Sequence, residues 1–300
     1  WLGITADESP AAGGPKEPYV QSERVEMYRE YAQWLVDNGK AYLDYTSDRV
    51  DPEVADDGDA HSSGYNLAGR NLSAEEIERY KADGVKPVVR LLVPLDGKTE
   101  FDDLVLGTIK RKNKDLPPDP ILLKSDGFPT YHLANVIDDH VMEISHVLRA
   151  QEWVPSTPLH MLLYDAFGWE PPTFAHLPMV MGKDGSKLSK RHGATSVIEF
   201  RKQGYLPEAI TNYITMLGWS YDDSREFFTR EDLETLFSVE KINKAPAVFD
   251  YKKLDWYNGQ YIRQCDDQRL LNLLLPYVQT EGWISGAEGE GSTFEERDRL

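Results

Sequence analysis

The sequence predicts an α/β protein, because β-like stretches alternate with helical patterns through the middle of the chain. The β-like stretches are Ile121 to Lys124, Ile144 to Arg149 and Phe174 to Met181. Between them we expect one helix from about Tyr131 and another that is capped at Ser156 and runs to Phe167, before Gly168. A parallel βαβ unit places its loops at the carboxyl ends of the strands, where ligands bind in open α/β sheets. We therefore expect the functional site at that edge.

Helices are also expected on both sides of this region. From Ser22 to Val36 the apolar residues follow helical spacing, and Gly39 supplies a stop. The opening Trp1 to Ile4 is interpreted as the end of a helix already under way. Later helical patterns cover Pro207 to Leu217, Thr229 to Phe237 and Asp250 to Arg263, and another begins after residue 266.

The segment from about residue 41 to 120 is predicted to be an α+β module. Residues 47–70 are polar and acidic, which favours a loop. Ser73 to Glu76 has the form of a capping box and predicts a helix to about Asp83. The predicted strands are Pro87 to Leu95 and Asp103 to Ile109, with a turn at Asp96-Gly97.

Composition limits the class of protein. The 300 residues are 40% hydrophobic but contain no apolar run near the ~20 residues that span a bilayer. No signal peptide opens the chain, so we expect a cytoplasmic protein, or an organellar one without its targeting segment. Cys265 is the only cysteine, which excludes an intrachain disulfide and a zinc site made of several cysteines. The histidines show no metal-ligand spacing, so we expect no resident metal.

The formal charge of −18 argues against a general nucleic-acid binder, because phosphate contacts need clustered cations. An RNA partner requires the basic residues to lie together on one face. The candidates are Lys110, Arg111, Lys112 and Lys114 in one run, and Arg201 and Lys202 in the basic region that starts at Lys187. An ordinary solvated surface is the alternative for both.

A cationic loop from Met181 to Gly193 is the most informative stretch. A turn at Asp184-Gly185 is followed by Lys187, Ser189, Lys190 and Arg191, on backbone that we expect to be irregular and mobile. Such a loop can close over a polyphosphate while charge moves onto a leaving pyrophosphate. The alternative is a solvated basic loop.

A carboxylate pocket is predicted from three residues. Tyr131 and Asn135 lie four apart on one predicted helix, and Arg149 ends a strand at the rim of the sheet. If they converge, the guanidinium matches a carboxylate in bidentate fashion. The alternatives are a core aromatic, a polar helix residue and a salt-bridge partner of Asp138 or Asp139.

Four further residues are candidates for a nucleotide site. Glu152 and Trp153 follow the strand that ends at Arg149, where they could lie near a ribose and a base. Met179 and Val180 come just before the cationic loop and could flank adenine. For the apolar members plain core packing is the alternative.

The string Lys187-Leu-Ser-Lys-Arg191 is similar to the Lys-Met-Ser-Lys-Ser signature of class I aminoacyl-tRNA synthetases, in the form seen in bacterial glutamyl-tRNA synthetases. Other segments resemble that family in the same order, so the resemblance covers nearly the whole chain. They are Asp126 to Asn135, Asp138 to His140, His146 to Arg149, Glu152-Trp153, Phe249-Asp250, Lys253 to Trp256, Asn258 and Tyr261 to Arg263.

The resemblance implies a Rossmann-like nucleotide-binding domain, split by an α+β insertion that holds the acceptor end of tRNA and followed by a helical domain. The implied segments are 1–40 and 121–185 for the nucleotide-binding domain, 41–120 for the insertion, 186–265 for the signature loop and stem-contact helices, and 266–300 for the start of an anticodon-binding domain. The family's other signature, His-Ile-Gly-His, is absent, so we expect an incomplete amino-terminal half and no tRNA charging by these 300 residues alone.

The implied activity joins L-glutamate to tRNA(Glu) through glutamyl-adenylate, using ATP with Mg²⁺, in a monomer. Lys187 and Lys190 take the catalytic role, and the pocket around Arg149 takes glutamate. The implied ATP-binding residues are Lys187, Ser189, Lys190, Arg191, Glu152, Trp153, Met179 and Val180. Some relatives carry zinc-binding cysteines where this chain has Asp44 and Thr46, so no zinc is expected.

Two alternatives stay open. One is a glutamyl-queuosine tRNA(Asp) synthetase, which lacks an anticodon-binding domain; the segment from Phe249 to Arg263 and its continuation count against it. The other is a non-catalytic synthetase-like RNA-binding module. Intact Lys187, Lys190 and Arg149 count against that reading.

Overall fold

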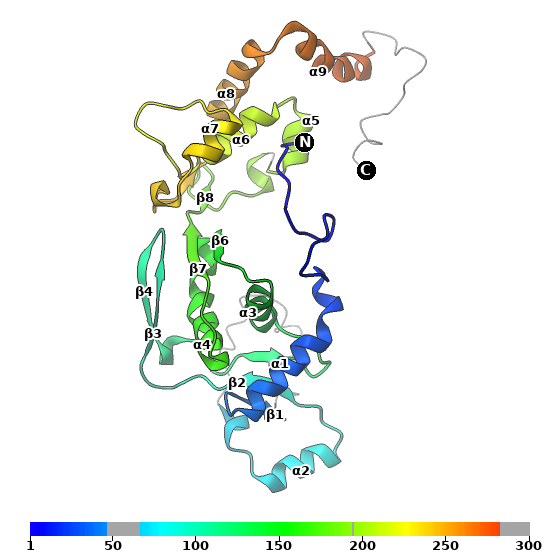
Figure 1. Ribbon diagram of the computed structural model, residues 1–300, viewed down its shortest axis with the longest axis vertical. Coiled ribbons are helices and arrows are strands. Elements are labelled where there is room, and N and C mark those ends of the chain that lie inside the picture. The colour runs from blue at the N-terminus through cyan, green and yellow to red at the C-terminus, as the bar shows by residue number, and fades with distance from the viewer. Residues whose placement is uncertain (47–66, 194, 283–300) are drawn as a thin grey trace. The chain divides into compact units, whose positions relative to one another are not determined.

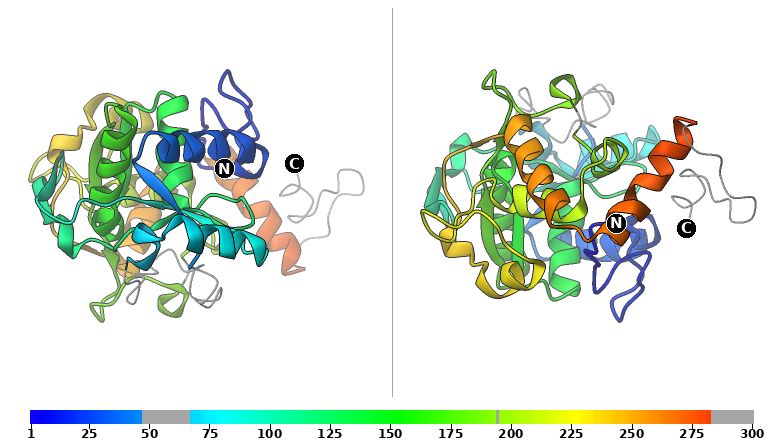
Figure 2. Two further views of the ribbon diagram at one scale, coloured as in Figure 1. Left: turned by 90° about the horizontal axis from the view of Figure 1, so that it is seen from below. Right: turned by 90° about the horizontal axis from the view of Figure 1, so that it is seen from above.

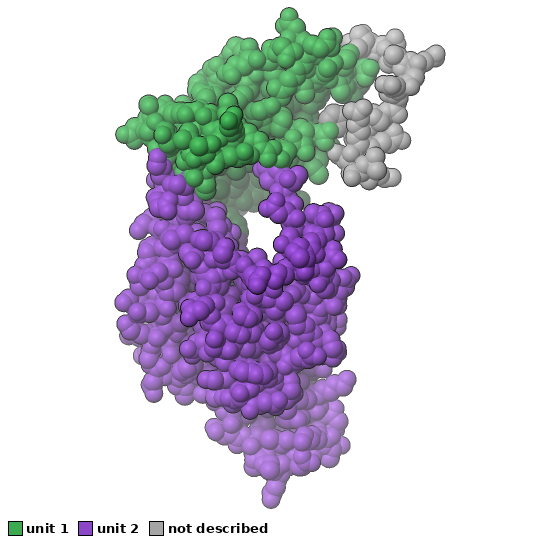
Figure 3. All heavy atoms as spheres, viewed as in Figure 1, with its two compact units in different colours: residues 1–3, 180–237, 247–300 green, residues 4–179, 238–246 purple. Residues whose placement is uncertain are grey.

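Two compact units make up the computed structural model of the protein, which describes residues 1–46, 67–193 and 195–282 (Figure 1). Unit 1 contains Trp1–Gly3, Val180–Phe237 and Ala247–Leu300, and unit 2 contains Ile4–Met179 and Ser238–Pro246 (Figure 3). The chain thus passes from one unit to the other between Met179 and Val180, just before the cationic loop.

Unit 2 is built on two sheets. The larger has the strand order β4-β3-β7-β6, and in it β7 pairs in parallel with both β3 and β6, while β3 and β4 form an antiparallel hairpin. The smaller is antiparallel, with the order β1-β2-β5. The strands are β1 Ala41–Asp44, β2 Val88–Leu91, β3 Lys98–Asp103, β4 Gly107–Lys112, β5 Ile121–Leu123, β6 His146–Ala150 and β7 Thr173–Leu177.

Three helices of unit 2 share one apolar core with these sheets. They are α1 (Val25–Asp37), α3 (Tyr131–Val141) and α4 (Thr157–Phe167), and they pack side by side (Figures 1 and 2). Apolar residues at helical spacing face inward from each, for example Tyr28, Ala32 and Leu35 from α1. Gly168 ends α4 in the left-handed conformation that glycine adopts without strain.

Unit 1 is mainly helical. Its two short strands, β8 (Val180–Met181) and β9 (Ala247–Val248), pair in parallel. Its helices are α5 Val197–Lys202, α6 Pro207–Thr215, α7 Arg230–Leu236, α8 Tyr251–Gln264 and α9 Asp267–Thr280. α6 packs against α8, with Ile210, Tyr213, Leu254 and Tyr257 buried at their contact.

Most predicted helices are confirmed to within a few residues. Helix α2 (Ala74–Ala82) carries the full capping box, in which Glu76 N–H donates to the Ser73 hydroxyl and the Glu76 carboxylate accepts from Ser73 N–H. The described helices α1, α4, α6, α7 and α8 likewise match their predicted ranges. Ser156 is the N-cap residue of α4 as predicted, but its side chain makes no capping hydrogen bond, and a 3₁₀ helix (Gln151–Ser156) already precedes α4.

The strand predictions need three corrections. Residues 103–109 form no single strand, because Leu104–Leu106 make the turn of the β3–β4 hairpin and the Asp103 carboxylate accepts the N–H groups of Val105 and Leu106. The stretch from Phe174 to Met181 is divided between β7 and β8, with Pro178, which has no N–H to donate to a ladder, between them. The strand at Ile121 exists, but it pairs antiparallel with β2 and not with the parallel strands.

The opening residues are also corrected. Trp1 to Ile4 form no helix, and the Gly3 carbonyl accepts a hydrogen bond of 2.6 Å from the Arg230 guanidinium. Most of the predicted acidic loop at 47–70 lies outside the described residues. Among the described residues, no helix combines the length and apolar character needed to cross a membrane.

Replacing a core leucine should destabilise unit 2 far more than replacing an exposed one. Leu163 on α4 has no solvent exposure, so Leu163→Ala should lower the free energy of unfolding by about 2–5 kcal/mol, through lost burial and the cavity left behind. Leu104, which is 47% exposed at the hairpin turn, is the control. Urea denaturation of Leu163→Ala and Leu104→Ala measures the difference in unfolding free energy. Equal destabilisation by the two substitutions would contradict the assignment of Leu163 to the core.

Candidate anion site and cationic loop

Arg149 lies near the end of β6 and is half-buried, and each part of its guanidinium meets a neutral acceptor. Its Nε donates to His176 Nε2 at 3.1 Å, and its Nη2 donates to the Thr157 hydroxyl at 2.7 Å. Its Nη1 contacts the Tyr131 hydroxyl at 3.5 Å. Strand β7 and helices α4 and α3 thus each hold one side of the guanidinium.

No carboxylate pairs with this guanidinium among the described residues. The proposed partner Asp138 instead forms an ion pair with Arg24 at 3.3 Å and accepts hydrogen bonds from Tyr28 and Gln21. Asp139 interacts with Arg149 electrostatically but forms no ion pair with it, and its carboxylate lies 3.5 Å from the Tyr164 hydroxyl. The salt-bridge alternative for Arg149 is therefore wrong. Burial lowers the pKa of Arg149, but the guanidinium stays protonated at neutral pH. An anion that binds here can therefore accept a charge-assisted hydrogen bond from it.

Two aromatic rings form a wall beside Arg149. The rings of Tyr131 and Trp153 lie 4.8 Å apart between centroids, and the guanidinium carbon lies 5.9 Å from the centre of the Trp153 ring. Tyr131 is 38% exposed, so it is not the core aromatic that was the alternative. The structure therefore brings Trp153, a candidate for the nucleotide site, against the candidate carboxylate pocket.

Asn135 shares the helix face of Tyr131 but contacts neither Tyr131 nor Arg149 by a hydrogen bond. It is half-buried, and its amide makes no hydrogen bond with any described residue. Helical spacing places it one turn beyond Tyr131, on the same side of α3. Glu152 is exposed on the 3₁₀ helix after β6, and Met179 is half-buried at the end of unit 2.

Sequence reasoning missed three residues at this site, namely Thr157, His176 and Asp103. Thr157 lies in a predicted helix and His176 in a predicted strand, and the sequence pattern assigns neither of them to a site. A polar side chain within the apolar run Phe174-Ala-His-Leu177 was the available signal for His176. Only strand pairing brings Asp103 close to it in space.

The cationic loop belongs to unit 1 and is more regular than expected. An antiparallel bridge pairs Met181 with Lys187, and Gly182 N–H donates to the Ser186 carbonyl at 2.7 Å. Residues Lys190–His192 form a 3₁₀ helix. The expectation of irregular backbone is thus wrong for these parts, although Gly185, with a φ of +76°, makes the turn that was predicted.

His192 holds the two sides of the cationic loop together through hydrogen bonds to Ser189 and Asp184. Ser189 N–H donates to its Nδ1 at 3.0 Å, so the ring proton is on Nε2, which donates to Asp184 at 3.1 Å. Asp184 also accepts from the N–H and hydroxyl of Ser186, and these bonds hold its pKa well below the usual range. A side chain at Gly182 would lie 2.7 Å from the His192 ring, so only glycine fits there.

The cations of the loop point into solvent. Lys187, Ser189, Lys190 and Arg191 are all exposed, and Arg191 donates to the Ser186 hydroxyl at 2.6 Å. Lys190 forms no ion pair within the described part of the chain. Val180, half-buried at the start of the loop, accepts a backbone hydrogen bond from Leu188 at 3.0 Å.

The model of the catalytic domain of class I tRNA synthetases (E and Q) matches residues 1–256. The chain belongs to this family. It is 56% identical over 302 residues to the glutamate–tRNA ligase of Borreliella burgdorferi, covering 100% of this chain and 61% of that protein. It is 57% identical over 284 residues to the glutamate–tRNA ligase of Treponema denticola, covering 94% of this chain and 56% of that protein.

Comparison with solved structures also identifies the fold of this class I synthetase domain. A glutamate tRNA ligase from Elizabethkingia meningosepticum, crystallised in complex with its amino acid, superposes with a TM-score of 0.83 at 34% identity, covering 96% of this chain and 62% of that one. The fold is therefore the α/β catalytic domain of class I synthetases. The chain spans about three fifths of the length of these relatives.

The two groups of basic residues in this synthetase domain lie on different elements, one on the β3–β4 hairpin and the other at the end of α5. Lys110 of β4 pairs with Glu100 across the β3–β4 hairpin at 3.2 Å, and Lys98 of β3 pairs with the same carboxylate at 3.0 Å. Lys110, Arg111 and Lys112 follow one another as exposed residues of β4, with Lys114 just beyond. Arg201 and Lys202 are the last residues of α5, where a positive charge interacts favourably with the negative end of the helix dipole.

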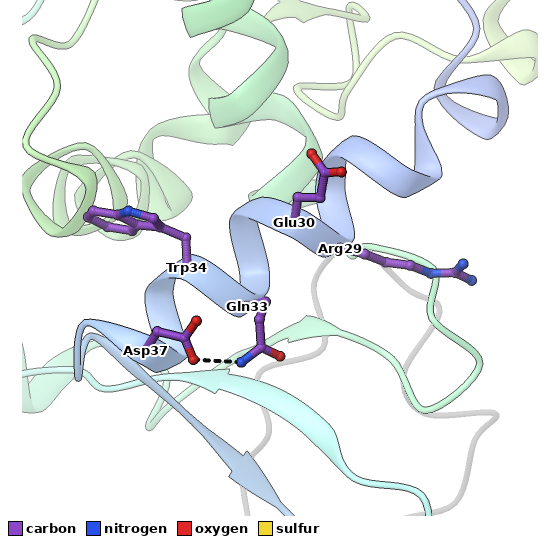
Figure 4. A pocket seen from close by; sticks show the side chains of 5 residues that line it. All are labelled: Arg29, Glu30, Gln33, Trp34 and Asp37. Carbon is purple, nitrogen blue, oxygen red and sulfur yellow. Dashed lines mark hydrogen bonds between the residues drawn. The ribbon is translucent and has the colours of Figure 1, made fainter.

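A surface hollow elsewhere in unit 2 contains none of these candidates. It is lined by Arg29, Glu30, Gln33, Trp34 and Asp37, all from α1 (Figure 4). Gln33 donates to Asp37 at 2.7 Å, while the other side chains point to different sides of the helix. Over residues 1–46, 67–193 and 195–282, no group of three or more His, Cys, Asp or Glu side chains is arranged to hold a metal ion.

Asp139, on α3 behind the anion site, should make stability depend on pH. Burial raises its pKa to about 6, above the ordinary 3.8, so ionising it costs more in the folded than in the unfolded chain. Folding stability should therefore fall as pH rises from about 4 to 6. Asp139→Asn should raise the unfolding free energy relative to wild type by roughly 1–3 kcal/mol at pH 7.5 and by little at pH 4.

Urea denaturation at the two pH values measures this, with Asp165→Asn as the control because Asp165 is exposed on α4. An Asp139→Asn variant that is equally stable or less stable than wild type at pH 7.5 would contradict the cost of ionisation.

Proposed function

We propose that the chain forms most of the catalytic region of a glutamate–tRNA ligase. The enzyme would activate L-glutamate with ATP to give glutamyl-adenylate and pyrophosphate, and then transfer the glutamyl group to tRNA(Glu) with release of AMP. The names of relatives at 56% identity support this activity.

One observation carries the choice of glutamate. The Arg149 guanidinium is half-buried, held by three neutral acceptors, and has no carboxylate partner among the described residues. A substrate carboxylate supplies the missing charge and accepts two parallel N–H bonds. A neutral amide, as in glutamine, supplies no charge, so the pocket favours the acidic amino acid. In this proposal Tyr131 and Asn135 add hydrogen bonds.

Activation needs charge stabilisation more than a general base, because the α-carboxylate of glutamate is already a nucleophile at pH 7. Lys190, assisted by Lys187, would stabilise the departing pyrophosphate, with Ser189 and Arg191 adding donors. Two unit charges 4 Å apart gain about 1 kcal/mol in water and about 4 kcal/mol in a partly shielded site, so closure of the loop over the phosphates matters.

Other contacts complete the proposal. ATP would arrive with Mg²⁺ on its phosphates, since Mg²⁺ sites of this kind use few protein ligands. Glu152, Trp153, Met179 and Val180 would bind the nucleoside. The tRNA would contact Lys110, Arg111, Lys112 and Lys114 on its acceptor end and Arg201 and Lys202 on its stem, on a monomeric, cytoplasmic enzyme.

Each segment of the chain would have the role that the corresponding segment has in the family. Residues 1–40 and 121–185 would contribute to the nucleotide-binding domain, 41–120 to acceptor-end binding and 186–265 to the signature loop and stem contacts. Residues 266–300 would begin the anticodon-binding region.

The activity is tested with the full-length protein that contains this chain. We expect ATP-dependent transfer of radiolabelled glutamate to tRNA(Glu), and no transfer of glutamine. Charging of tRNA(Asp) instead would favour the queuosine-modifying alternative, and absence of any ATP-dependent activation would favour a non-catalytic RNA-binding module.

Removing the guanidinium should weaken glutamate binding selectively. Arg149→Ala removes a charge-assisted bidentate partner, so KM for glutamate should rise roughly 30- to 1,000-fold, as expected for a loss of about 2–4 kcal/mol. KM for ATP should change less than about threefold. Steady-state aminoacylation measures both constants, with exposed Arg79→Ala as the control. Equal loss for both substrates would mean that Arg149 is structural.

Removing the loop ammonium should slow the chemical step and leave glutamate binding intact. Lys190→Ala should lower kcat roughly 10²- to 10³-fold, the usual effect of losing one group that stabilises transition-state charge. Lys183 belongs to the same loop but pairs with Asp250 at 2.9 Å, so Lys183→Ala is the matched control. ATP–pyrophosphate exchange in the presence of tRNA measures the step. An unchanged rate of ATP–pyrophosphate exchange in the Lys190→Ala enzyme would contradict a catalytic role for Lys190.

A further inference from the structure

Three polar side chains form a row across neighbouring strands of the larger sheet. Arg149 on β6 is the direct register partner of His176 on β7, and Asp103 at the end of β3 is the partner of Phe174, two residues before His176. Because alternate residues of a strand face the same side, the three side chains share one face. Asp103 Oδ2 lies 2.6 Å from His176 Nδ1, and Arg149 Nε lies 3.1 Å from His176 Nε2.

Backbone N–H groups surround the side chain of Asp103. Its side chain is fully buried and accepts three backbone N–H groups, from Val105 at 3.0 Å, Leu106 at 2.9 Å and His176 at 3.0 Å. With every neighbour of Asp103 donating, Nδ1 of His176 must carry its proton toward this carboxylate.

The second nitrogen of His176 is then an acceptor. Burial lowers the pKa of His176, and the charge of Arg149 lowers it further, against an opposing effect from Asp103. At neutral pH the ring therefore has one proton, on Nδ1, and its Nε2 lone pair faces the Nε–H of Arg149. Thr157 fits this arrangement, since its hydroxyl donates to the Trp153 carbonyl at 3.1 Å while accepting from Arg149.

We propose that Asp103 and His176 are positioning residues that hold the Arg149 guanidinium in the orientation that receives the side-chain carboxylate of the amino acid substrate. This inference rests on the proposed glutamate-binding role of Arg149. Asp103 selects the tautomer, His176 accepts from Nε, and Thr157 accepts from Nη2, so only the outer part of the guanidinium is left for substrate. Neither residue touches glutamate itself.

Acidification should disturb this arrangement. A protonated His176 presents an N–H to the N–H of Arg149, so the acceptor is lost and two positive charges meet. The charged and titratable groups around His176 are Asp103 from β3, Arg149 from β6 and His160 from α4. Asp139, with a pKa raised by burial to about 6, acts on Arg149 over the same pH range and must be removed in the test.

Two substitutions at His176 separate the contacts in the full-length enzyme. The amide nitrogen of His176→Asn reaches the place of Nδ1 and keeps the bond to Asp103, but it offers Arg149 no acceptor. The longer His176→Gln places an amide oxygen near the position of Nε2 and restores that acceptor. We expect KM for glutamate to rise about tenfold in His176→Asn and less than about threefold in His176→Gln, with kcat and KM for ATP nearly unchanged in both.

The pH profile adds a readout that a merely structural role would not move. In an Asp139→Asn background, KM for glutamate should rise only as pH falls well below 6.5, the ordinary pKa of histidine, because burial lowers the pKa of His176. The same background with His176→Gln should show a flat profile down to about pH 5.5, above the ordinary pKa of the glutamate side chain. Nitrogen NMR of the wild-type protein should show His176 protonated on Nδ1 only.

Several results would overturn the inference. They are a proton on Nε2 of His176, equal loss of glutamate binding in the Asn and Gln variants, or a pH profile that the Gln substitution leaves unchanged. Arg149→Ala separates this failure from that of the proposed function. If Arg149→Ala raises KM for glutamate and His176→Asn does not, only the positioning role fails; if Arg149→Ala has no effect, the glutamate site itself is wrong.

Discussion

The candidate anion site of unit 2 depends on how the protein accommodates the half-buried guanidinium of Arg149. A guanidinium loses favourable hydration when it is buried, and proteins usually compensate with a carboxylate. Arg149 instead has Tyr131, Thr157 and His176 around it, which satisfy its donors without neutralising its charge. The nearby acid Asp138 pairs with Arg24, so it does not compete. The charge of Arg149 is thus not neutralised by an ion pair, and this supports the proposed selection of substrate by charge.

The sequence could predict whatever depends on local spacing. The helices that carry Tyr131 and Thr157 follow from apolar residues at helical intervals, and Arg149 was found because it ends a β-like stretch. The partners of Arg149 could not be found in this way. Asp103 and His176 are far apart in the chain and meet only through the parallel pairing of β3 with β7, a non-local register that no local pattern specifies.

The same reasoning explains the strand errors. The run from Asp103 to Ile109 resembles one strand because it is rich in Leu, Val, Thr and Ile. The Asp103 carboxylate, however, accepts two N–H groups of the following residues and closes a turn. Pro178 is visible in the sequence, yet its effect, which is to end β7 before β8 joins another sheet, shows only once the pairings are known. Turn chemistry and strand partners therefore limited the prediction more than residue propensities did.

Each candidate site closes its hydrogen bonds within its own unit. The contacts of Arg149 come from β6, β7, α3 and α4 of unit 2, whereas the cationic loop is held by Asp184, Ser186 and His192 of unit 1. Lys190 forms no ion pair among the described residues, and Glu199 is the acid that interacts with it electrostatically. The anion pocket and the exposed cationic loop therefore each form their hydrogen bonds inside one unit, so the effects of substitutions at the two sites are expected to be independent.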